Sequence, residues 1–316
     1  MPQVECRPFD PSMAGEVAAL LEGAFAEYRS LPPLNLLAPT APYVPAAELA
    51  ATLAADESCT RASFVAVQDG RIVSAAIARA VGETLAWWRV ATVADHRREG
   101  LAMGCMEAGE GAMRTWGQAE VATDPPVDSR WAAAEALSAA GGYHLEDPER
   151  RNISMMVEGW VERPVELPAG YELTTVTEAD VQGWTDCRNA VFGSDVGPEW
   201  LRDHFMSRAD FDATGWLLVK REGRVVGISG AIDAVDPSGP EATRGGMIEY
   251  VGVLDEERGH GLGELAVTAC LNWLARRGVP RTTLITQPFR QPAIRLYERL
   301  GFRTIAAWHR WVKPLR

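Results

Sequence analysis

An internal duplication constrains this chain more than any other feature of its sequence. The segment from Val4, VECRPFDPSMAGEVAALLEGAFAEY, resembles the segment from Tyr171, YELTTVTEADVQGWTDCRNAVFGSD. Each reads as an alternating strand, an acidic turn and an amphipathic helix. Further segments repeat in the same order: a hairpin, a strand leading into a glycine-rich loop and a helix, and a helix that glycine stops before another strand. The sequence therefore predicts one arrangement of strands and helices that occurs twice.

Each copy contains a predicted β-hairpin, SFVAVQDGRIVSAAIARA in the first and GWLLVKREGRVVGISGAI in the second. The turns fall at Asp69-Gly70 and at Glu222-Gly223. Such pairs suit a two-residue hairpin turn, because the turn needs positive φ angles.

The duplication also predicts two domains. At 316 residues the chain is about twice the usual domain size. The join is expected within residues 158–170, EGWVERPVELPAG, because its two prolines and final glycine suit a linker. We therefore expect domains at 1–160 and 168–316. Extra residues at 30–45 in the first copy and at 233–246 in the second have the composition of loops.

Composition and charge narrow the possible partners. The formal net charge of -12 argues against nucleic acid, whose binding depends on clustered Lys and Arg. No apolar run is long enough to span a membrane, and the N-terminus lacks the pattern of a signal peptide, so a cytoplasmic protein with no membrane contact is expected. Five scattered cysteines without a CxxC pair, and isolated histidines, predict reduced, mostly buried thiols and no metal site.

A glycine-rich loop follows an apolar strand in the second copy. The strand is residues 251–254, and the loop runs through 258–263, RGHGLG. Apolar residues then recur at helical spacing, at Leu262, Ala266, Ala269, Cys270 and Trp273. A loop between a strand and a helix N-terminus is an anion site, because free backbone N–H groups and the helix dipole converge there. Arg258 can add charge.

Two common phosphate loops do not fit this pattern. No Gly-Lys-Ser/Thr is present for a P-loop, and the spacing is G-x-G-x-G rather than G-x-G-x-x-G. Arg258-x-x-Gly261-x-Gly263 instead resembles the R/Q-x-x-G-x-G/A loop of the GCN5-related N-acetyltransferases (GNAT), which grips the pyrophosphate of acetyl-CoA. Residues 290–305, RQPAIRLYERLGFRTI, resemble the second signature of that family, a helix that bears a tyrosine and ends at Gly-Phe.

The resemblance covers nearly the whole chain as two copies and is similar in architecture to the mycothiol synthases. It implies an α/β (α+β) fold of two tandem GNAT domains, each a mixed, mostly antiparallel central sheet flanked by helices. It also implies acetyl-CoA as co-substrate. The residues implied for coenzyme binding lie on the strand, the loop and the later helix: Val251, Val253, Arg258, Gly259, His260, Gly261, Leu262, Gly263 and Arg290. Arg290 departs from the family pattern, which commonly has asparagine there.

The resemblance further implies an acid and a base. Tyr297 stands where the family has its general acid, and a pKa of about 10 keeps a tyrosine protonated for a leaving thiolate; the alternative is a core tyrosine on an apolar helix face. Glu249 is our choice for the base that deprotonates the amine; the alternative is a strand-edge carboxylate in solvent. Alternation predicts that Glu249, Val251 and Val253 face one side. The resemblance implies that the strand splays there, so that the N–H groups of Val251 to Val253 would lie near the thioester carbonyl.

The first copy keeps the loop but not the predicted chemistry. Arg97-x-x-Gly100-x-Ala102 repeats the loop pattern, so coenzyme binding there is possible. Trp88, 161 positions before Glu249, and Ser138, four before the helix-ending glycine, match the base and the acid. Neither can replace its partner, and a scaffold or ligand-binding copy without turnover is expected.

Three functions remain open from the sequence. The first is an acetyl-CoA-dependent N-acetyltransferase in which the amine of a small molecule attacks the thioester directly, in the C-terminal domain. The second is a mycothiol synthase-like enzyme that acetylates the cysteinyl amine of a pseudodisaccharide. The third is a non-catalytic acyl-CoA sensor, which would need neither Tyr297 nor Glu249. A monomer or a homodimer is expected.

Overall fold

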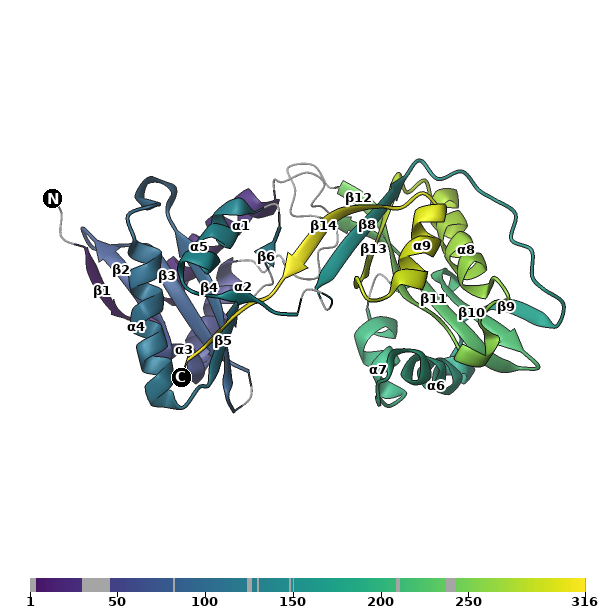
Figure 1. Ribbon diagram of the computed structural model, residues 1–316, viewed down its shortest axis with the longest axis horizontal. Helices are drawn as coiled ribbons and strands as arrows, with labels where there is room; N and C mark the ends of the chain where they lie inside the picture. Colours follow the sequence, from purple (N-terminus) through teal and green to yellow (C-terminus); the bar gives the residue numbers. More distant parts are fainter. Residues whose placement is uncertain are drawn as a thin grey trace. The chain divides into compact units, whose positions relative to one another are not determined.

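The computed structural model describes residues 4–29, 46–81, 83–123, 127–129, 131–147, 149, 151–208, 211–236 and 243–315. The chain divides into two compact units, Met1–Arg151 with Ala306–Arg316, and Asn152–Ile305 (Figure 1). The loop expected at 30–45 and residues 237–242 of the loop expected at 233–246 lie outside the described residues.

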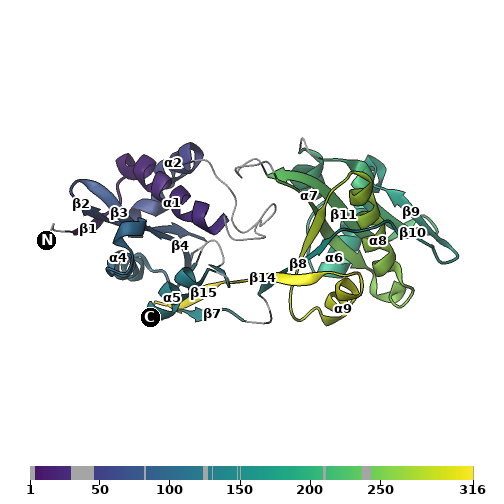
Figure 2. The same cartoon turned by 90° about the horizontal axis from the view of Figure 1, so that it is seen from above.

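The first unit contains the elements of the first copy together with the last strand of the chain. They are β1 (Glu5–Pro8), α1 (Ala14–Arg29), α2 (Ala46–Ala55), α3 (Glu57–Ala62), β2 (Phe64–Gln68), β3 (Arg71–Ala80), β4 (Leu85–Thr92), α4 (Leu101–Trp116), β5 (Glu120–Thr123), β6 (Val127–Asp128), α5 (Ala132–Ala140), β7 (His144–Leu145) and β15 (Trp311–Pro314). α1 and α2 lie along one side of β2, β3 and β4, and α4 lies along the other (Figure 2).

The second unit repeats this plan. Its elements are β8 (Asn152–Glu158), β9 (Tyr171–Thr175), α6 (Val181–Phe192), α7 (Glu199–Leu201), a π-helical turn (Arg202–Met206), β10 (Trp216–Arg221), β11 (Arg224–Asp236), β12 (Thr243–Val253), α8 (Leu262–Arg276), β13 (Arg281–Thr286) and α9 (Gln291–Arg299), followed by β14 (Arg303–His309), which continues into the first unit.

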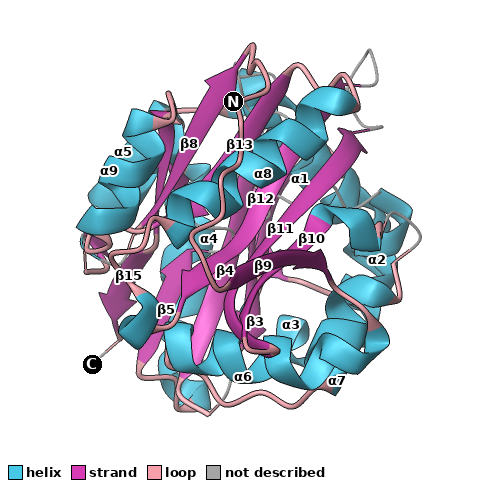
Figure 3. Ribbon diagram, turned by 90° about the vertical axis from the view of Figure 1, so that its right-hand side faces the viewer, coloured by secondary structure: helices cyan, strands magenta, loops and turns pink. Residues whose placement is uncertain are grey.

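Helices cover both faces of the second sheet (Figure 3). One face carries a core that we call the α8 cluster, with Ile248, Val267, Leu271, Leu284, Tyr297 and Phe302 among its buried members. The other carries the α6 cluster, with Val181, Trp184, Trp216, Leu218 and Ile228 among its buried members. The site described below lies where β12 passes between these two clusters.

Both sheets are mixed and mostly antiparallel, as predicted. The strand orders are β1-β2-β3-β4-β5-β15-β7 and β6-β14-β8-β13-β12-β11-β10-β9, and the parallel pairs among the described registers are β4 with β5 and β12 with β13. The predicted hairpin turns are confirmed: φ is positive at Asp69 and Gly70, and again at Glu222 and Gly223. Positive φ at both central residues is the signature of a type I′ turn.

The boundaries of the units differ from the expected domains 1–160 and 168–316. β8 pairs with β13 from Arg281↔Glu158 to Thr286↔Ile153, so it belongs to the second sheet. β15 lies between β5 and β7 in the first sheet. Each sheet is thus completed by a strand from the other half of the sequence, which covers backbone groups that would otherwise remain unpaired. Local composition carries no signal for such an exchange.

The expected linker at 158–170 is also anchored rather than free. Asn272 on α8 accepts from Trp160 Nε1 (3.0 Å) and from Arg163 N (3.1 Å), and its own Nδ2 donates to Arg163 O (2.7 Å). Asn272 is buried, and these bonds satisfy its amide. The first part of the linker is therefore fixed on the outer surface of α8.

Two smaller expectations concern the thiols and membrane-spanning helices. All five cysteines are free, and four of them are buried, as expected. Within the described ranges, no helix combines the length and apolar character needed to cross a membrane.

Candidate functional site

The glycine-rich loop of the second unit leads from β12 into α8. After a 3-10 turn at Asp255–Glu257, φ is positive at Gly259 (87°) and at Gly261 (76°), a region that other residues enter only with strain. α8 begins at Leu262, and Leu265 N donates to Gly261 O (3.0 Å). The N–H groups of residues 262–264 have no preceding helical turn whose carbonyl groups could accept from them. These N–H groups and the helix dipole therefore favour an anion.

The surroundings of the loop fit a phosphate group. A Cβ placed on Gly259 or Gly261 would meet no atom within 4 Å, so the backbone here is open to a ligand. The buried carboxylate of Glu257 holds the loop in place by accepting from the Tyr171 hydroxyl (2.5 Å) and from Arg221 Nη1 (3.1 Å). The loop is thus both open and rigid, which favours tight binding of a ligand.

The side chains of Arg258 and His260 are exposed. Arg258 Nη2 lies 2.6 Å from Asp255 Oδ1, in a pair whose members are 61% and 78% exposed. Such a pair contributes little free energy, so Arg258 can exchange it for a ligand phosphate. His260 Nδ1 lies 3.1 Å from the carbonyl oxygen of Glu257, so the imidazole contacts the backbone of the loop itself.

Gly263 has a different reason for being glycine. A Cβ at this position would lie 3.3 Å from Leu296 Cδ1 on α9, and Arg299 of α9 pairs with Glu264 of α8 (3.0 Å). The first turn of α8 therefore packs against the helix that carries Tyr297. The sequence pattern assigned this glycine to the phosphates, and the structure adds that the absence of a side chain lets α8 and α9 pack closely here.

β12 contains a β-bulge directly before the loop. β12 pairs with the parallel strand β13 over residues 246–248 and then continues to Val253 without it. On its other side the ladder to β11 shifts by one residue, so Tyr250 and Val251 together face Ser229. Tyr250 takes a positive φ of 52°. A bulge re-aims side chains and interrupts pairing, and here it exposes backbone N–H groups beside the diverging β13.

The bulge overturns one expectation about facing side chains. Alternation predicted that Glu249, Val251 and Val253 share one face, and this is wrong. Val251 packs against the α8 cluster, whereas Val253 packs against the α6 cluster. The extra residue in β12 breaks the period of two on which the prediction depended.

Glu249 lies on the α6 face, in a row across three strands. Gly230 pairs with Glu249 on one side and with Trp216 on the other, and a Cβ at Gly230 would lie 3.1 Å from the Trp216 ring. The indole therefore leans across β11 toward the carboxyl group. Burial raises the pKa of the half-buried Glu249 to about 7, against the opposing charge of Arg208. A carboxylate with this pKa suits a general base near neutral pH.

An aromatic cluster lies on the same face of the sheet as this carboxylate, and the sequence did not predict it. Tyr250 makes edge contacts with Trp184, Trp200 and Phe205, at centroid distances of 5.6, 5.5 and 5.7 Å. Phe205 in turn lies 4.6 Å from the Trp216 ring. Tryptophans are frequent in residues 184–216, but nothing in their spacing indicates that they converge on β12. Apolar surroundings of this kind disfavour the charged form of a carboxyl group that is buried on this face.

Tyr297 is on the opposite face, in the α8 cluster. Its side chain is 6% exposed, and its ring lies 5.9 Å from that of Phe302. Burial raises its pKa to about 12, while the charge of Arg290 acts in the opposite direction. Its hydroxyl has no hydrogen-bond partner within the described part of the chain. The residue is thus a core residue that stays protonated and has a donor to spare.

Arg290 immediately precedes α9 and connects that helix to the bulge. Its guanidinium lies 5.2 Å from the ring of Phe192, whose ring contacts Tyr250 at 5.9 Å. The side chain also lies near Gln287 Oε1 (3.4 Å). Arg290 thus contributes positive charge between Tyr297 and the bulge.

The first unit repeats the loop in nearly the same conformation. φ is 67° at Arg98 and 80° at Gly100, α4 begins at Leu101, and Ala102 follows in its first turn. Arg97 Nε donates to Thr92 O (3.2 Å). The geometry of a helix N-terminal anion site is therefore present in both copies.

The first unit lacks the bulge, and this changes the counterpart of Glu249. β3 and β4 pair without a shift from Ser74↔Thr92 to Ala80↔Ala86. Ile77 and Gly230 each lie seven residues after their turn glycine, and they pair with Arg89 and Glu249 respectively. The counterpart is therefore Arg89, not Trp88 as expected, because a one-residue bulge offsets the two strands.

The side chains at the two other matched positions of the first copy are engaged in its core. Trp88 is buried, and its Nε1 lies 2.5 Å from the Tyr143 hydroxyl. Ser138 Oγ donates to Ala134 O (2.9 Å) in its own helix. Tyr143 N bonds Ser138 O as Phe302 N bonds Tyr297 O, at 3.0 Å in both cases, so Ser138 keeps its place as the counterpart of Tyr297.

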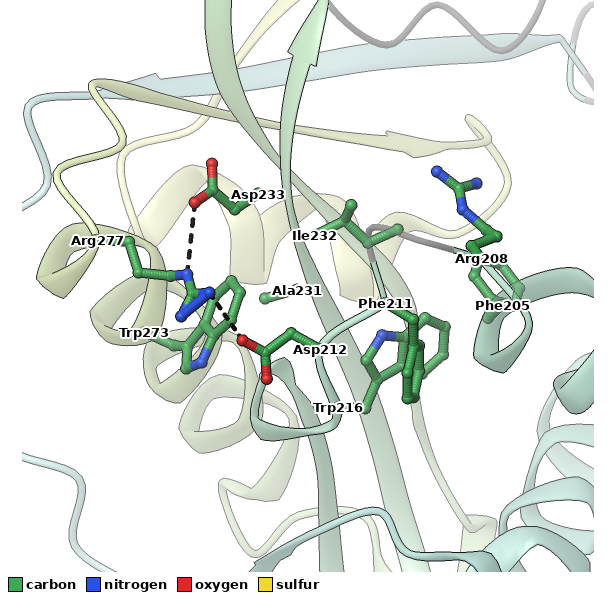
Figure 4. A pocket seen from close by; sticks show the side chains of 10 residues that line it. All are labelled: Phe205, Arg208, Phe211, Asp212, Trp216, Ala231, Ile232, Asp233, Trp273 and Arg277. Atoms are coloured by element: carbon green, nitrogen blue, oxygen red, sulfur yellow. Dashed lines mark hydrogen bonds and ion pairs between the residues drawn. The ribbon is translucent and has the colours of Figure 1, made fainter.

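A small pocket adjoins the aromatic cluster (Figure 4). Its volume is about 60 Å³. Its lining residues are Phe205, Arg208, Phe211, Asp212, Trp216, Ala231, Ile232, Asp233, Trp273 and Arg277. A larger hollow of about 370 Å³ lies between α8 and the segment that contains Glu162, Arg163 and Val165, and none of the candidate site residues lines it.

Sequence comparisons relate the chain to known acetyltransferases. The model of the acetyltransferase (GNAT) family matches residues 181–302. A mycothiol acetyltransferase of Clavibacter michiganensis subsp. michiganensis is 31% identical over 258 residues, 75% of each chain. One from Thermomonospora curvata is 28% identical over 208 residues, 63% of each chain. The match spans 47% and 48% of the length of two further relatives, from Acidothermus cellulolyticus and Thermobispora bispora.

Solved structures share the fold of both copies. A GCN5-related N-acetyltransferase from Sphaerobacter thermophilus superposes with a TM-score of 0.66 at 20% identity, over 99% of this chain and 96% of that one. A tandem GNAT protein from the clavulanic acid biosynthesis pathway gives the same TM-score at 17% identity, over 99% of both chains. These likenesses concern the fold alone.

Proposed function

Because the chain belongs to the GNAT acetyltransferase family, we propose that it transfers an acetyl group from acetyl-CoA to the amine of a small molecule, with the chemistry in the second unit. One observation carries this proposal. Glu249, with a pKa of about 7, stands at a β-bulge whose strand leads directly into the N-terminus of α8.

Acetyl-CoA supplies the activated acetyl group, and the loop would hold its pyrophosphate. The N–H groups at the start of α8 and the side chain of Arg258 would bind phosphate oxygens, since the loop is open there. The N–H groups of β12 beside the diverging β13 would bind the thioester carbonyl and stabilise charge as it develops on that oxygen.

Two side chains would move protons. Glu249 in its ionised form accepts a proton from the amine, so that the neutral nitrogen can attack the carbonyl carbon. Tyr297 donates its proton to the departing thiolate of CoA; its raised pKa keeps it protonated until then. The two groups lie on opposite faces of β12. The acetyl group would therefore lie between them, where β12 and β13 diverge.

A second candidate is acetylation of the cysteinyl amine of a pseudodisaccharide, as in mycothiol synthesis. It is favoured by the relatives named mycothiol acetyltransferase, one of which matches 75% of this chain. Both candidates use the same base and acid, and they differ in the acceptor. A non-catalytic acyl-CoA sensor would need neither.

An acceptor panel tests the proposal. Wild type and Glu249→Gln are mixed with acetyl-CoA and individual amines, including a cysteinyl pseudodisaccharide, and release of CoA is followed. We expect release with at least one amine and its loss in the variant. Tight binding of acetyl-CoA without release on any acceptor would replace the proposal with the sensor.

A further inference from the structure

The pocket beside Glu249 is suited to hold the part of the acceptor that does not react; this inference rests on the proposed function. Trp216 lines the pocket and lies in one row with Gly230 and Glu249. Neighbouring strands are about 4.8 Å apart, so the backbone of Trp216 is about 10 Å from that of Glu249. An amine at the Glu249 carboxylate therefore reaches the pocket with a short chain.

Much of the pocket lining is apolar. Phe205, Phe211, Trp216 and Ile232 contribute to it, with Phe205 and Arg208 at one end and Ile232 in the middle (Figure 4). A volume of about 60 Å³ accommodates roughly four to six water molecules or one compact group. C–H groups of a ligand would be favoured against these rings.

The far end is polar and rigid. Arg277 Nη2 donates to Asp212 Oδ2 (2.7 Å) and Arg277 Nε to Asp233 Oδ2 (3.4 Å), and the guanidinium lies 4.2 Å from the Trp273 ring. Its Nη1 has no acceptor among the described residues. Arg277 lines the pocket and is held by two carboxylates, so its remaining N–H groups can donate to a ligand oxygen with less loss of side-chain entropy.

The charges at this end cancel. Arg277 and Arg244 both pair with Asp233, and Asp212 pairs with Arg277, so two cations face two carboxylates. At the other end the charge of Arg208 acts on Glu249 and favours its ionised form. A balanced network offers no net attraction that would offset the desolvation of a charged ligand group against the aromatic cluster.

We propose that the acceptor is an amine whose far end carries uncharged oxygen atoms, hydroxyl or carbonyl groups, which accept from Arg277 Nη1 while the C–H surface of the acceptor packs on Phe211 and Trp216. Carboxylate-bearing and purely apolar amines of the same length are poorer acceptors. Arg277 then determines specificity through binding and has no part in the proton transfers.

Four amines of matched length test this: 6-amino-1-hexanol, 6-aminohexanamide, hexylamine and 6-aminohexanoate. We expect the first two to have the highest kcat/KM. Arg277→Lys keeps the charge but loses the paired N–H donors of the guanidinium, and Arg277→Met loses both. Each variant should lower kcat/KM for the first two amines about tenfold, mainly through KM, and leave kcat/KM for hexylamine unchanged. Arg276→Met is the matched control, since Arg276 is adjacent, pairs with Glu162 and does not line the pocket.

Binding of 6-aminohexanamide, measured by calorimetry without coenzyme, separates the two proposals. Transfer to all four amines with no dependence on Arg277, or a preference for 6-aminohexanoate, overturns the pocket assignment and leaves the acetyltransferase intact. Binding that depends on Arg277 without any transfer overturns the proposed function and leaves the pocket. Neither binding nor transfer overturns both.

Discussion

The two glycine loops are nearly identical in backbone conformation, whereas the strands that precede them differ. Gly100 and Gly261 have φ angles of 80° and 76°, and both stand at the start of a long helix. β12 has a bulge with a positive φ at Tyr250, whereas β4 pairs without a shift. An anion site thus needs only a local turn, whereas the proposed chemistry needs a distorted strand and the carboxylate that the distortion places.

The largest expected effect follows from the base. Glu249→Gln should lower kcat about 10²- to 10⁴-fold, because general base catalysis contributes that much. Wild-type kcat/KM should fall below pH 7 as the carboxyl, with its pKa of about 7, is protonated, and the variant should lack this limb. Arg89→Gln, the change at the counterpart, should leave kcat unaltered. Equal pH profiles for wild type and Glu249→Gln would remove Glu249 from the mechanism.

Glu249→Gln should lose activity but gain stability at alkaline pH. A carboxyl whose folded pKa is about 7, above its ordinary 4.5, favours folding below pH 4.5, and this stability is lost as pH rises through 7. Glu249→Gln should therefore be more stable than wild type at pH 8, by up to about 3 kcal/mol, and not at pH 4. Urea unfolding at the two pH values measures this. If the difference in unfolding free energy between variant and wild type were the same at pH 4 and pH 8, the carboxyl would be solvated.

The next largest effect is expected from replacing Tyr297, the proposed general acid. Tyr297→Phe should lower kcat by about 10²-fold, the lower end of what general acid catalysis contributes. The melting temperature should not change, because the ring still fills the α8 cluster and only the hydroxyl is lost. Ser138→Ala, at its counterpart, should not alter kcat. Full activity of Tyr297→Phe would identify Tyr297 as a core residue alone.

A smaller effect concerns the two loops. Gly261→Ala adds a side chain at φ 76° and should raise KM for acetyl-CoA about tenfold, because the strain of roughly 1–2 kcal/mol shifts the N–H groups at the start of α8. Gly100→Ala has the same strain at φ 80° but should leave KM unchanged if turnover belongs to the second copy. A rise in KM from Gly100→Ala would assign turnover to the first copy as well.

The smallest effect is a local strain that only the first loop contains. Arg98 takes φ 67°, where its counterpart is Gly259 at 87°. Arg98→Gly should stabilise the first unit by no more than about 1 kcal/mol, since the relief of strain is partly offset by the entropy of glycine. Thermal unfolding should show a higher midpoint for the first unit only. A lower midpoint would indicate contacts of the Arg98 side chain that outweigh its backbone strain.

Much of the site could be predicted where it depends on local sequence. The loop at 258–263, the hairpin turns and the family signature around Tyr297 are contiguous segments with fixed turn or helix requirements. The counterpart of Glu249 could not be predicted, because counting residues back from the loop does not reveal a bulge. The second copy has extra residues between its hairpin and its loop, and the sequence does not show which of them belong to the connection and which to β12. The register assigns one residue of it to Tyr250.

The sequence by itself determined the duplication, the two glycine-rich loops at helix starts and the residue types of the proposed acid and base, since each loop and residue type is encoded within a few adjacent positions. Only the tertiary structure decided which strand completes each sheet, which face Glu249 occupies, and that Trp216 shares a row with it while the charge of Arg208 acts on it. These depend on pairing between residues far apart in the chain, where the energies of burial and of ladder hydrogen bonds choose among registers that local composition leaves equal.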